Sequence, residues 1–291
     1  MSTIAMTAPA DLPQARKPRG WSPWQAWGVI LLAPYILVFL AFVVYPVGYG
    51  FWLARHPESY AKLFADPIFS KAVVNTIVFL LVAINVKMVV ALLLSGFFTQ
   101  QRLWVRWLAV IFILPWAVPS IPTILSFRFM LNPEWGVINQ LIFRFTADDG
   151  PNWLNEPWLA LTLAMVVHIW KSLPFWTLIM IAGRLAISSD LYEAASVDGA
   201  SKWQKFLYVT WPSMQTLYVT CTILSMIWTL GDFNSVYLLT GGGPADLTHV
   251  LATIGIRYLR LDQVDMAMAT IVCALPLVIP LAGFMMARLS K

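Results

Sequence analysis

Two apolar runs of this sequence each carry a stripe of polar or aromatic side chains at helical spacing. The first stripe, at i, i+3, i+4 and i+7, comprises His168, Lys171, Ser172 and Phe175. The second stripe, at i, i+4 and i+7, comprises Ser225, Thr229 and Asp232. Polar side chains within a membrane helix usually face the bundle interior or a water-filled cavity. Hydroxyls, a carboxylate and aromatic rings together suit a solute with many hydroxyls and an apolar ring face, such as a carbohydrate. The stripes therefore predict a solute-lining surface.

Each stripe also has a purely structural interpretation. Ser and Thr side chains can bond back to a carbonyl of their own helix. Aromatic residues near the stripes can be packing residues or part of an interfacial belt; these are Trp170, Trp176, Trp228 and Phe233. For Asp232 the sequence favours a functional role or an intramembrane pair with Lys171. The lone charge of Lys87 is interpreted as snorkelling or structurally paired, and Arg128 as snorkelling to the interface.

The elements that hold these stripes must be membrane helices. The mean hydropathy is +0.73 and only 11% of residues are charged, whereas a soluble domain is about a quarter charged. Four stretches carry no charge at all, and two more carry a single basic residue each, Lys87 and Lys171. Each is long enough for the roughly 20 apolar residues that a bilayer core requires. The sequence therefore predicts an all-α integral membrane protein with six spans.

Several spans contain proline, which neighbouring helices tolerate as kinks in a membrane bundle. The prolines concerned are Pro115, Pro119, Pro122, Pro174, Pro276 and Pro280. If both termini are cytoplasmic, the cytoplasmic segments carry more Lys and Arg than the external segments do, as membrane proteins usually show. This predicts a cytoplasmic tail at 1–23 and a single membrane domain at 24–291. The first span is too long for a signal-peptide core and is expected to remain as an anchor.

The net charge of +5 does not indicate nucleic-acid binding, because the basic residues are scattered and form no patch with interleaved aromatics. No metal site is expected, since the three histidines are far apart and both cysteines lie in apolar runs. No Walker A string occurs, and the glycines at 241–243 are followed by Pro244 rather than by Lys and Ser or Thr. Neither ATP hydrolysis nor any other catalytic activity, and no cofactor, is expected in this chain.

The cytoplasmic loop at 185–213 is unusually polar for this sequence. Asp190, with Glu193 three residues later, predicts an acidic capping box at the start of a short helix. Gly199 is expected to end that helix. A second amphipathic stretch, 203–209, leads to Pro212, where the next span is expected to begin. An ordinary amphipathic loop lying on the lipid headgroups remains the structural alternative.

This loop, with EAA at 193–195, Gly199 and VTWP at 209–212, resembles the EAA loop of binding-protein-dependent ABC import permeases. The longer string LYEAASVDGASKWQKF is similar to the carbohydrate-uptake, maltose-type branch. YLLTGGGPADLTHVL, after the fifth span, is typical of the first of two permease types in such systems. Trp211 stands where Leu is usual, and Ser188 and Ser189 replace a turn that customarily contains proline.

The resemblance implies the bundle of a type I importer permease in a bacterial inner membrane, moving a sugar, oligosaccharide or polyol. The implied partners are a second, homologous permease, two cytoplasmic ATPase subunits that bind ATP and Mg²⁺, and a periplasmic or lipid-anchored substrate-binding protein. The implied ATPase-docking residues are Glu193, Ala194, Ala195, Asp198 and Gly199. The external loops at 131–157 and 239–264 are candidates for docking the binding protein.

Three alternatives remain open. An ABC permease for a solute that is not a carbohydrate would show the same features. A secondary transporter would have the same hydropathy but would work without an ATPase. A membrane-embedded enzyme would need a catalytic acid pair, and the adjacent Asp148 and Asp149 are followed directly by Gly150 and Pro151, which favours a loop.

Overall fold

The structure is a computed structural model that describes residues 22–100 and 102–289, with side chains described up to Ala287. The described residues form helices joined by turns and loops, and they include no strand. The predicted all-α class is therefore confirmed. The predicted tail at 1–23 lies almost wholly outside the described residues.

The chain divides into two units, the first ending at Trp52 and the second beginning at Leu53. In the first unit, α1 (Pro23–Phe39), the π-helix η1 (Leu40–Val44) and α2 (Tyr45–Leu53) form one continuous apolar helix. The Ser22 hydroxyl and the Gln25 side chain make a reciprocal capping box at its start. No residue of α1, η1 or α2 is buried.

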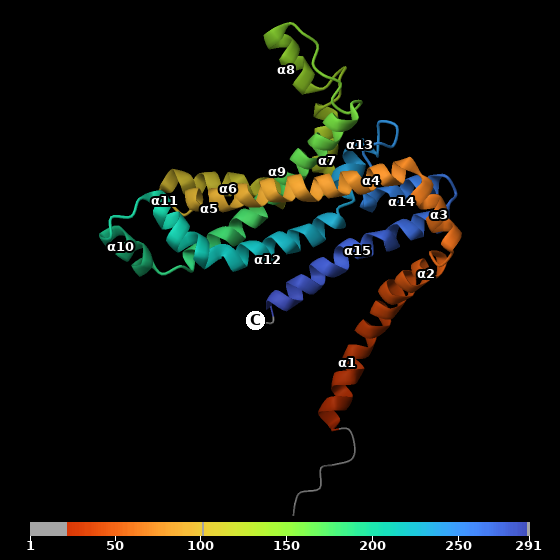
Figure 1. Ribbon diagram of the computed structural model, residues 1–291, viewed down its shortest axis with the longest axis horizontal. Coiled ribbons are helices and arrows are strands. Elements are labelled where there is room, and N and C mark those ends of the chain that lie inside the picture. The colour runs from red at the N-terminus through yellow and green to blue at the C-terminus, as the bar shows by residue number, and fades with distance from the viewer. Residues whose placement is uncertain (1–21, 101, 290–291) are drawn as a thin grey trace, which may run out of the picture. The chain divides into compact units, whose positions relative to one another are not determined.

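The second unit contains the remaining helices (Figure 1). They are α3 (Pro57–Ala65), α4 (Pro67–Val78), the π-helix η2 (Phe79–Ile84), α5 (Asn85–Phe98), α6 (Leu103–Ala117), α7 (Ser120–Met130), α8 (Val137–Thr146), α9 (Pro157–Leu185), α10 (Ser189–Val197), α11 (Lys202–Lys205), the π-helix η3 (Phe206–Thr210), α12 (Trp211–Leu230), α13 (Asn234–Thr240), α14 (Leu251–Arg260) and α15 (Val264–Leu289).

Four helices are long and apolar enough to cross a membrane. They are Pro23–Leu53, Pro67–Phe98, Pro157–Leu185 and Val264–Ala287. Two further helix pairs pass the same test together but are bent, by 94° between α6 and α7 and by 43° between α12 and α13. The six predicted spans are thus all present if each bent pair is one span.

The third and fifth spans are each broken into two helices. The sequence predicted a kink at Pro119 in the third span but no interruption in the fifth. Pro119 explains the sharper bend, because a residue before proline is forced out of the helical region. Val118 is accordingly extended, with ψ at 140°, and α6 ends one residue before it. In the fifth span, α12 ends at Leu230. Gly231 and Asp232 lie in the bend that follows. Pro115, Pro174, Pro276 and Pro280 remain inside continuous helices, as expected for a packed bundle.

Helix α9 is the central element of the second unit, packing against α5, α6, α12 and α13. Figure 1 shows α5, α6, α9 and α12 side by side. One core cluster joins α5, α9 and α12 through residues that include Met88, Trp176, Met180 and Met214. Gly183 permits the close approach of α9 and α12, because a Cβ at this position would collide with the Leu217 side chain.

Candidate functional site

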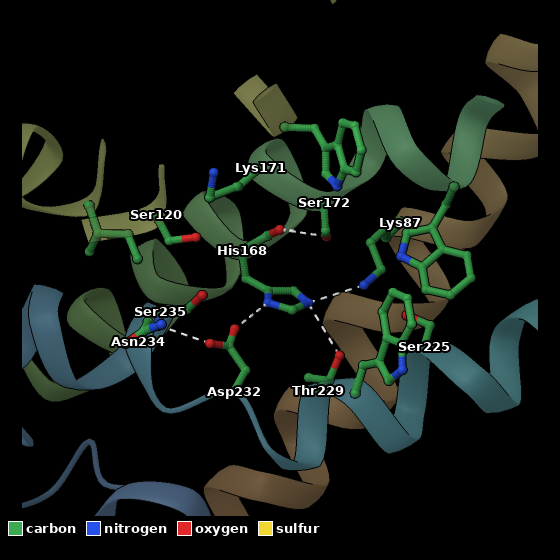
Figure 2. A pocket seen from close by; sticks show the side chains of 14 residues that line it. Lys87, Ser120, His168, Lys171, Ser172, Ser225, Thr229, Asp232, Asn234 and Ser235 are labelled. Atoms are coloured by element: carbon green, nitrogen blue, oxygen red, sulfur yellow. Dashed lines mark hydrogen bonds and ion pairs between the residues drawn. The ribbon is translucent and has the colours of Figure 1, made fainter. Parts of the chain in front are cut away.

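A cavity of about 290 Å³ opens among α5, α6, α7, α9 and the bend between α12 and α13 (Figure 2). It is lined by Lys87, Trp116, Ser120, Ile124, His168, Lys171, Ser172, Trp176, Ser225, Trp228, Thr229, Asp232, Asn234 and Ser235. The structure therefore brings together side chains from four of the predicted spans. A bilayer tolerates such a group of polar side chains only where it lines a cavity or is internally paired.

Six of the seven residues predicted to line the solute path lie on the wall of this cavity. They are His168, Lys171, Ser172, Ser225, Thr229 and Asp232. The exception is Phe175, whose ring instead packs against the indoles of Trp116, Trp176 and Trp228, at centroid distances of 5.6, 5.1 and 5.5 Å. Phe175 thus supports an aromatic wall rather than forming it.

His168 is the centre of a polar network in the cavity (Figure 2). Its Nδ1 lies 2.7 Å from Asp232 Oδ2, and its Nε2 lies 3.1 Å from Lys87 Nζ. A carboxylate accepts hydrogen bonds, so Nδ1 donates to Asp232 and Nε2 accepts from the Lys87 ammonium. Thr229 Oγ1 lies 3.3 Å from the same Nε2. The imidazole of the fourth span therefore connects a cation of the second span with a carboxylate and a hydroxyl of the fifth.

The predicted pair between Asp232 and Lys171 is not formed. Asp232 lies in the bend after α12 and turns to His168, while its Oδ1 accepts the backbone N–H of Ser235 at 3.1 Å. Lys171 Nζ donates instead to the carbonyls of Pro115, at 3.0 Å, and Val118, at 2.7 Å. These carbonyls belong to the last turn of α6 and the break after it, so the ammonium caps a helix end.

Ser225 differs from the other hydroxyls near the cavity. Ser172 bonds back to the His168 carbonyl at 2.7 Å, and Thr222 bonds back to the Tyr218 carbonyl at 2.7 Å. Ser172 therefore makes the back-bond that the structural interpretation describes, and it also lies on the cavity wall. The Ser225 side chain is 1% exposed, yet its Oγ has no hydrogen-bond partner within the described chain. An unpaired buried hydroxyl is costly, and the hydrogen-bonding capacity of Ser225 is unused within the described chain.

Sequence reasoning missed several lining residues: Lys87, Trp116, Ser120, Ile124, Asn234 and Ser235. The charge of Lys87 in an apolar run was a usable signal, and its interpretation as a structural pair agrees with its contact to His168. Ser120 reaches the cavity because α7 starts there, immediately after the break. Asn234 and Ser235 follow the second break, which periodicity alone does not reveal.

The predicted docking segment forms α10 and the turn after it. Glu193, Ala194, Asp198 and Gly199 are exposed, and Ala195 is half-buried. Gly199 has φ at +73°, which a glycine adopts without strain, and the Ala200 N–H closes the turn on the Ala195 carbonyl at 2.9 Å. The predicted helix end is therefore present.

Two details of this segment differ from the expectation. The cap is Ser188, whose hydroxyl accepts the Asp190 N–H at 3.3 Å, so Asp190 lies inside the first turn. The fifth span does not begin at Pro212 but at Lys202, because α11, η3 and α12 are continuous up to Leu230. Pro212 therefore lies inside this continuous helix, two residues after the π-helical segment η3 ends at Thr210.

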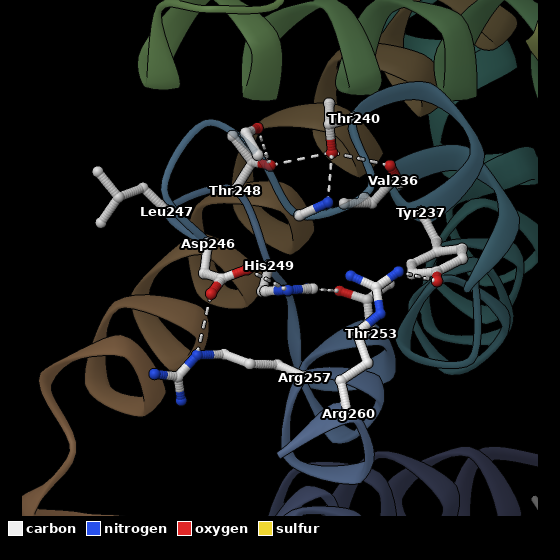
Figure 3. A network of polar contacts seen from close by, with 12 residues as sticks. Val236, Tyr237, Thr240, Asp246, Leu247, Thr248, His249, Thr253, Arg257 and Arg260 are labelled. Carbon is white, nitrogen blue, oxygen red and sulfur yellow. Dashed lines mark hydrogen bonds and ion pairs between the residues drawn. The ribbon is translucent and has the colours of Figure 1, made fainter.

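A second polar cluster joins α14 to the start of α4 through Asp66. Figure 3 shows the part of this cluster around Asp246, His249 and Arg257. Asp66 caps α4 through the Ile68 N–H at 2.8 Å and accepts from Arg257 at 2.7 Å and Tyr258 at 3.0 Å. Arg257 also donates to Asp246 at 3.1 Å. This cluster fixes α14 against the start of the second span.

Burial alone would raise the pKa of Asp66, but the Ile68 N–H and the side chains of Arg257 and Tyr258 outweigh burial and hold this pKa below its ordinary value. For Tyr258, burial and the Asp66 carboxylate both raise the pKa. Asp66 is therefore ionised and Tyr258 neutral, which is the arrangement that the hydrogen bonds require.

Comparison with known proteins identifies the family. Residues 87–291 match the family described as the inner membrane component of binding-protein-dependent transport systems. This chain belongs to that family. It is thus a multi-pass protein of the inner membrane and a transport component, and the predicted resemblance is confirmed.

Two relatives and one solved structure illustrate the similarity. The trehalose/maltose transport system permease protein MalF of Thermococcus litoralis is 29% identical over 265 residues, covering 87% of this chain and 90% of MalF. The sulfoquinovosyl glycerol transport system permease protein SmoG of Agrobacterium fabrum is 32% identical, covering 80% and 81%. A chain of a bacterial alginate ABC transporter, crystallised with a periplasmic protein bound to an alginate pentasaccharide, aligns with a TM-score of 0.77 at 22% identity, covering 90% and 92%. This likeness confirms the permease fold.

Lys171→Met should destabilise the break between α6 and α7, because the carbonyls of Pro115 and Val118 would lose their donor. We expect a loss of about 1 kcal/mol or more in unfolding free energy, as for other unpaired polar groups. Lys171→Arg retains a charged donor and should lose less. The measurement is thermal unfolding of the detergent-solubilised chain; equal melting temperatures for both variants and the wild type would contradict the capping role.

Asp66→Asn should weaken the link between α4 and α14. Because folding lowers the Asp66 pKa, the cluster contributes its full stabilisation above the unfolded pKa of about 3.9 and loses it as pH falls through the lower folded value. The variant should therefore melt below the wild type at neutral pH, and the difference should shrink at about pH 3. Asp148→Asn, in an exposed loop, is the control. A difference between Asp66→Asn and wild type that is the same at both pH values would contradict this assignment.

Proposed function

We propose that this chain is the first-type permease subunit of an ATP-driven, binding-protein-dependent importer for a sugar, oligosaccharide or polyol. The observation that carries the proposal is a polar cavity between α9 and α12, the two spans that flank the exposed α10. One end of this helix pair would thus bind solute while the other receives the ATPase. The names of the relatives, which include trehalose, maltose and sulfoquinovosyl glycerol permeases, support a carbohydrate.

The composition of the cavity wall also supports a carbohydrate. The indoles of Trp116, Trp176 and Trp228 supply an apolar aromatic surface that suits the ring face of a sugar. The polar part of the wall consists of the Ser225 hydroxyl and the network around His168. These groups can exchange hydrogen bonds with solute hydroxyls. The six stripe residues on the wall are accordingly proposed to contact the solute.

The family description and the exposed segment support the proposed partners. A second, homologous permease would complete the translocation unit, and two ATPase subunits would bind at Glu193, Ala194, Ala195, Asp198 and Gly199. The family description names binding-protein dependence, and the related alginate transporter was crystallised with its periplasmic protein. We infer that the α10 side is cytoplasmic, together with both termini, and that the loops at 131–157 and 239–264 face the binding protein.

Transport would proceed by alternating access around the cavity. Closure of the ATPase pair on ATP would move α10 and turn the cavity outward, where the binding protein releases its solute. Hydrolysis on the ATPase subunits would restore the inward-facing state. Residues of this chain bind and release the solute and transmit the movement; ATP and Mg²⁺ belong to the partner subunits.

The decisive experiment is to tag this chain in its native host, solubilise it in mild detergent and identify by mass spectrometry the proteins that copurify. A stoichiometric ATPase and a second permease of similar size are expected. A chain that copurifies with neither, alone or as a homodimer, would favour a secondary transporter and overturn the proposal.

Asp232→Ala should abolish uptake while leaving the complex assembled. Removing the carboxylate frees His168 Nδ1 and releases the bend between α12 and α13 from its contact with α9, so the cavity loses its organised polar centre. Uptake by cells and copurification of the partner subunits are the two readouts. Asp148→Ala serves as the matched control, and normal transport by Asp232→Ala would contradict the assignment.

Gly199→Val should leave the chain in the membrane but uncouple it from the ATPase. A β-branched residue is strained at a φ of +73°, so the turn that presents α10 must change. Stimulation of ATP hydrolysis by the binding protein is the measurement. Stimulation at the wild-type level would count against a docking role for this turn.

A further inference from the structure

A side-chain hydrogen bond attaches helix α10 to the fifth span, and neither of its two residues belongs to the proposed docking set. The Tyr192 hydroxyl lies 2.8 Å from Thr210 Oγ1. Thr210 is 1% exposed and is the last residue of η3, where the span continues into α12. Tyr192 is half-buried, whereas Val197, on the same short helix, is 88% exposed. The helix thus has an outward face available to a partner and an inward contact with the span.

The covalent connection between α10 and the fifth span is a short turn that contains a glycine and is expected to be flexible. Helix α10 ends at Val197 and α11 starts at Lys202, and between them Gly199 provides a flexible, left-handed position. A force on α10 could bend this turn without moving the span. The hydrogen bond between Tyr192 and Thr210 bypasses the turn. A second contact, from Lys205 Nζ to Ser196 Oγ at 2.5 Å, is exposed and therefore weaker.

The fifth span, which carries Thr210, is a continuous helix up to the bend. It runs without a break from Lys202 to Leu230. Thr210 and Thr229 lie 19 residues apart on it, which corresponds to about 28 Å at the rise of an α-helix. Thr229 contacts His168 in the cavity, and Asp232 follows directly at the bend. Movement applied at Thr210 therefore reaches the polar network of the cavity through one helix.

From this geometry we propose that the hydrogen bond between Tyr192 and Thr210 transmits the movement of α10 to the cavity. Tyr192 and Thr210 are positioning residues. They are neither among the cavity-lining residues nor among the proposed docking residues, and they act by fixing α10 to the fifth span. The inference rests on the proposed function, since it requires an ATPase that moves α10. It adds the physical connection between that movement and the solute site.

The test is a double-mutant cycle in the complete transporter, purified with its copurifying subunits and reconstituted in proteoliposomes. The variants are Tyr192→Phe, Thr210→Val and the combination, each of which removes a hydroxyl and little else. The control is Tyr208→Phe, at a tyrosine in η3 that is 77% exposed. Thr210→Ser, which restores the hydroxyl, tests rescue.

Two quantities are measured. The first is ATP hydrolysis, with and without the binding protein. The second is the rate at which a maleimide labels a cysteine placed at Ser120, in a chain carrying Cys221→Ala and Cys273→Ala. This rate is compared between the nucleotide-free state and the state trapped with MgATP, vanadate and the binding protein, so the solute need not be known.

We expect every variant to retain its ATPase and its basal hydrolysis within about twofold. Tyr192→Phe and Thr210→Val should each reduce the nucleotide-dependent change in labelling several-fold, and the double variant should be no worse than either. Tyr208→Phe and Thr210→Ser should behave as wild type. Such non-additivity is the signature of one shared contact.

Three results would overturn the inference: a normal labelling change in Tyr192→Phe, additive losses in the double variant, or loss of the ATPase from the Tyr192→Phe complex, which would make Tyr192 a docking residue. If the wild-type chain binds no ATPase, or shows no nucleotide-dependent change, the proposed function itself fails and this inference fails with it.

Discussion

In the bilayer core, the backbone groups freed by a helix break have no water to bind. Side chains of α9 stabilise both breaks near the cavity. Unpaired backbone groups at membrane depth each cost several kcal/mol, so interrupted spans need partners from neighbouring helices. At the first break, Lys171 caps the carbonyls of Pro115 and Val118. At the second, His168 holds the Asp232 carboxylate, while Asp232 in turn accepts the Ser235 N–H. One face of α9 thus stabilises the interruptions of two different spans.

This arrangement explains why charged residues are present at membrane depth at all. An isolated cation or carboxylate there would be strongly unfavourable. Lys87, His168 and Asp232 instead satisfy one another, and each comes from a different span or from the bend that follows one. The network is therefore a structural bond between spans as well as the polar wall of the cavity. A solute that exchanges hydrogen bonds with it necessarily acts on the packing of α5, α9 and the bend after α12. Ser225 has no hydrogen-bond partner in the described chain and takes no part in this network.

The sequence was sufficient for features that depend on local pattern. Gaps between charges located all six spans, and helical spacing found six of the residues on the cavity wall. It was insufficient where a contact depends on distant parts of the chain. Phe175 shares a helical face with His168, but packing among three indoles decides its position. Asp232 continues the spacing of the second stripe, yet α12 ends before it, and its partner is His168 rather than Lys171. The link from Asp66 to Arg257 crosses 191 residues and involves no local pattern.

Within the second unit, helix α4 precedes the family match but is part of the same folding unit. The match begins at residue 87, but Asn75 donates to the carbonyls of Leu247 and His249, at 2.8 and 2.9 Å. Thr76 accepts the first N–H of α14, from Leu251, at 2.8 Å. These buried side chains satisfy backbone groups of the loop and of α14, which would otherwise be unpaired. The segment with the glycines at 241–243 and the start of α14 therefore depends on α4 for its hydrogen bonds. A fragment that began at residue 87 would retain the cavity residues and α10 but would leave this loop without support, so the folding unit begins before the start of the family match.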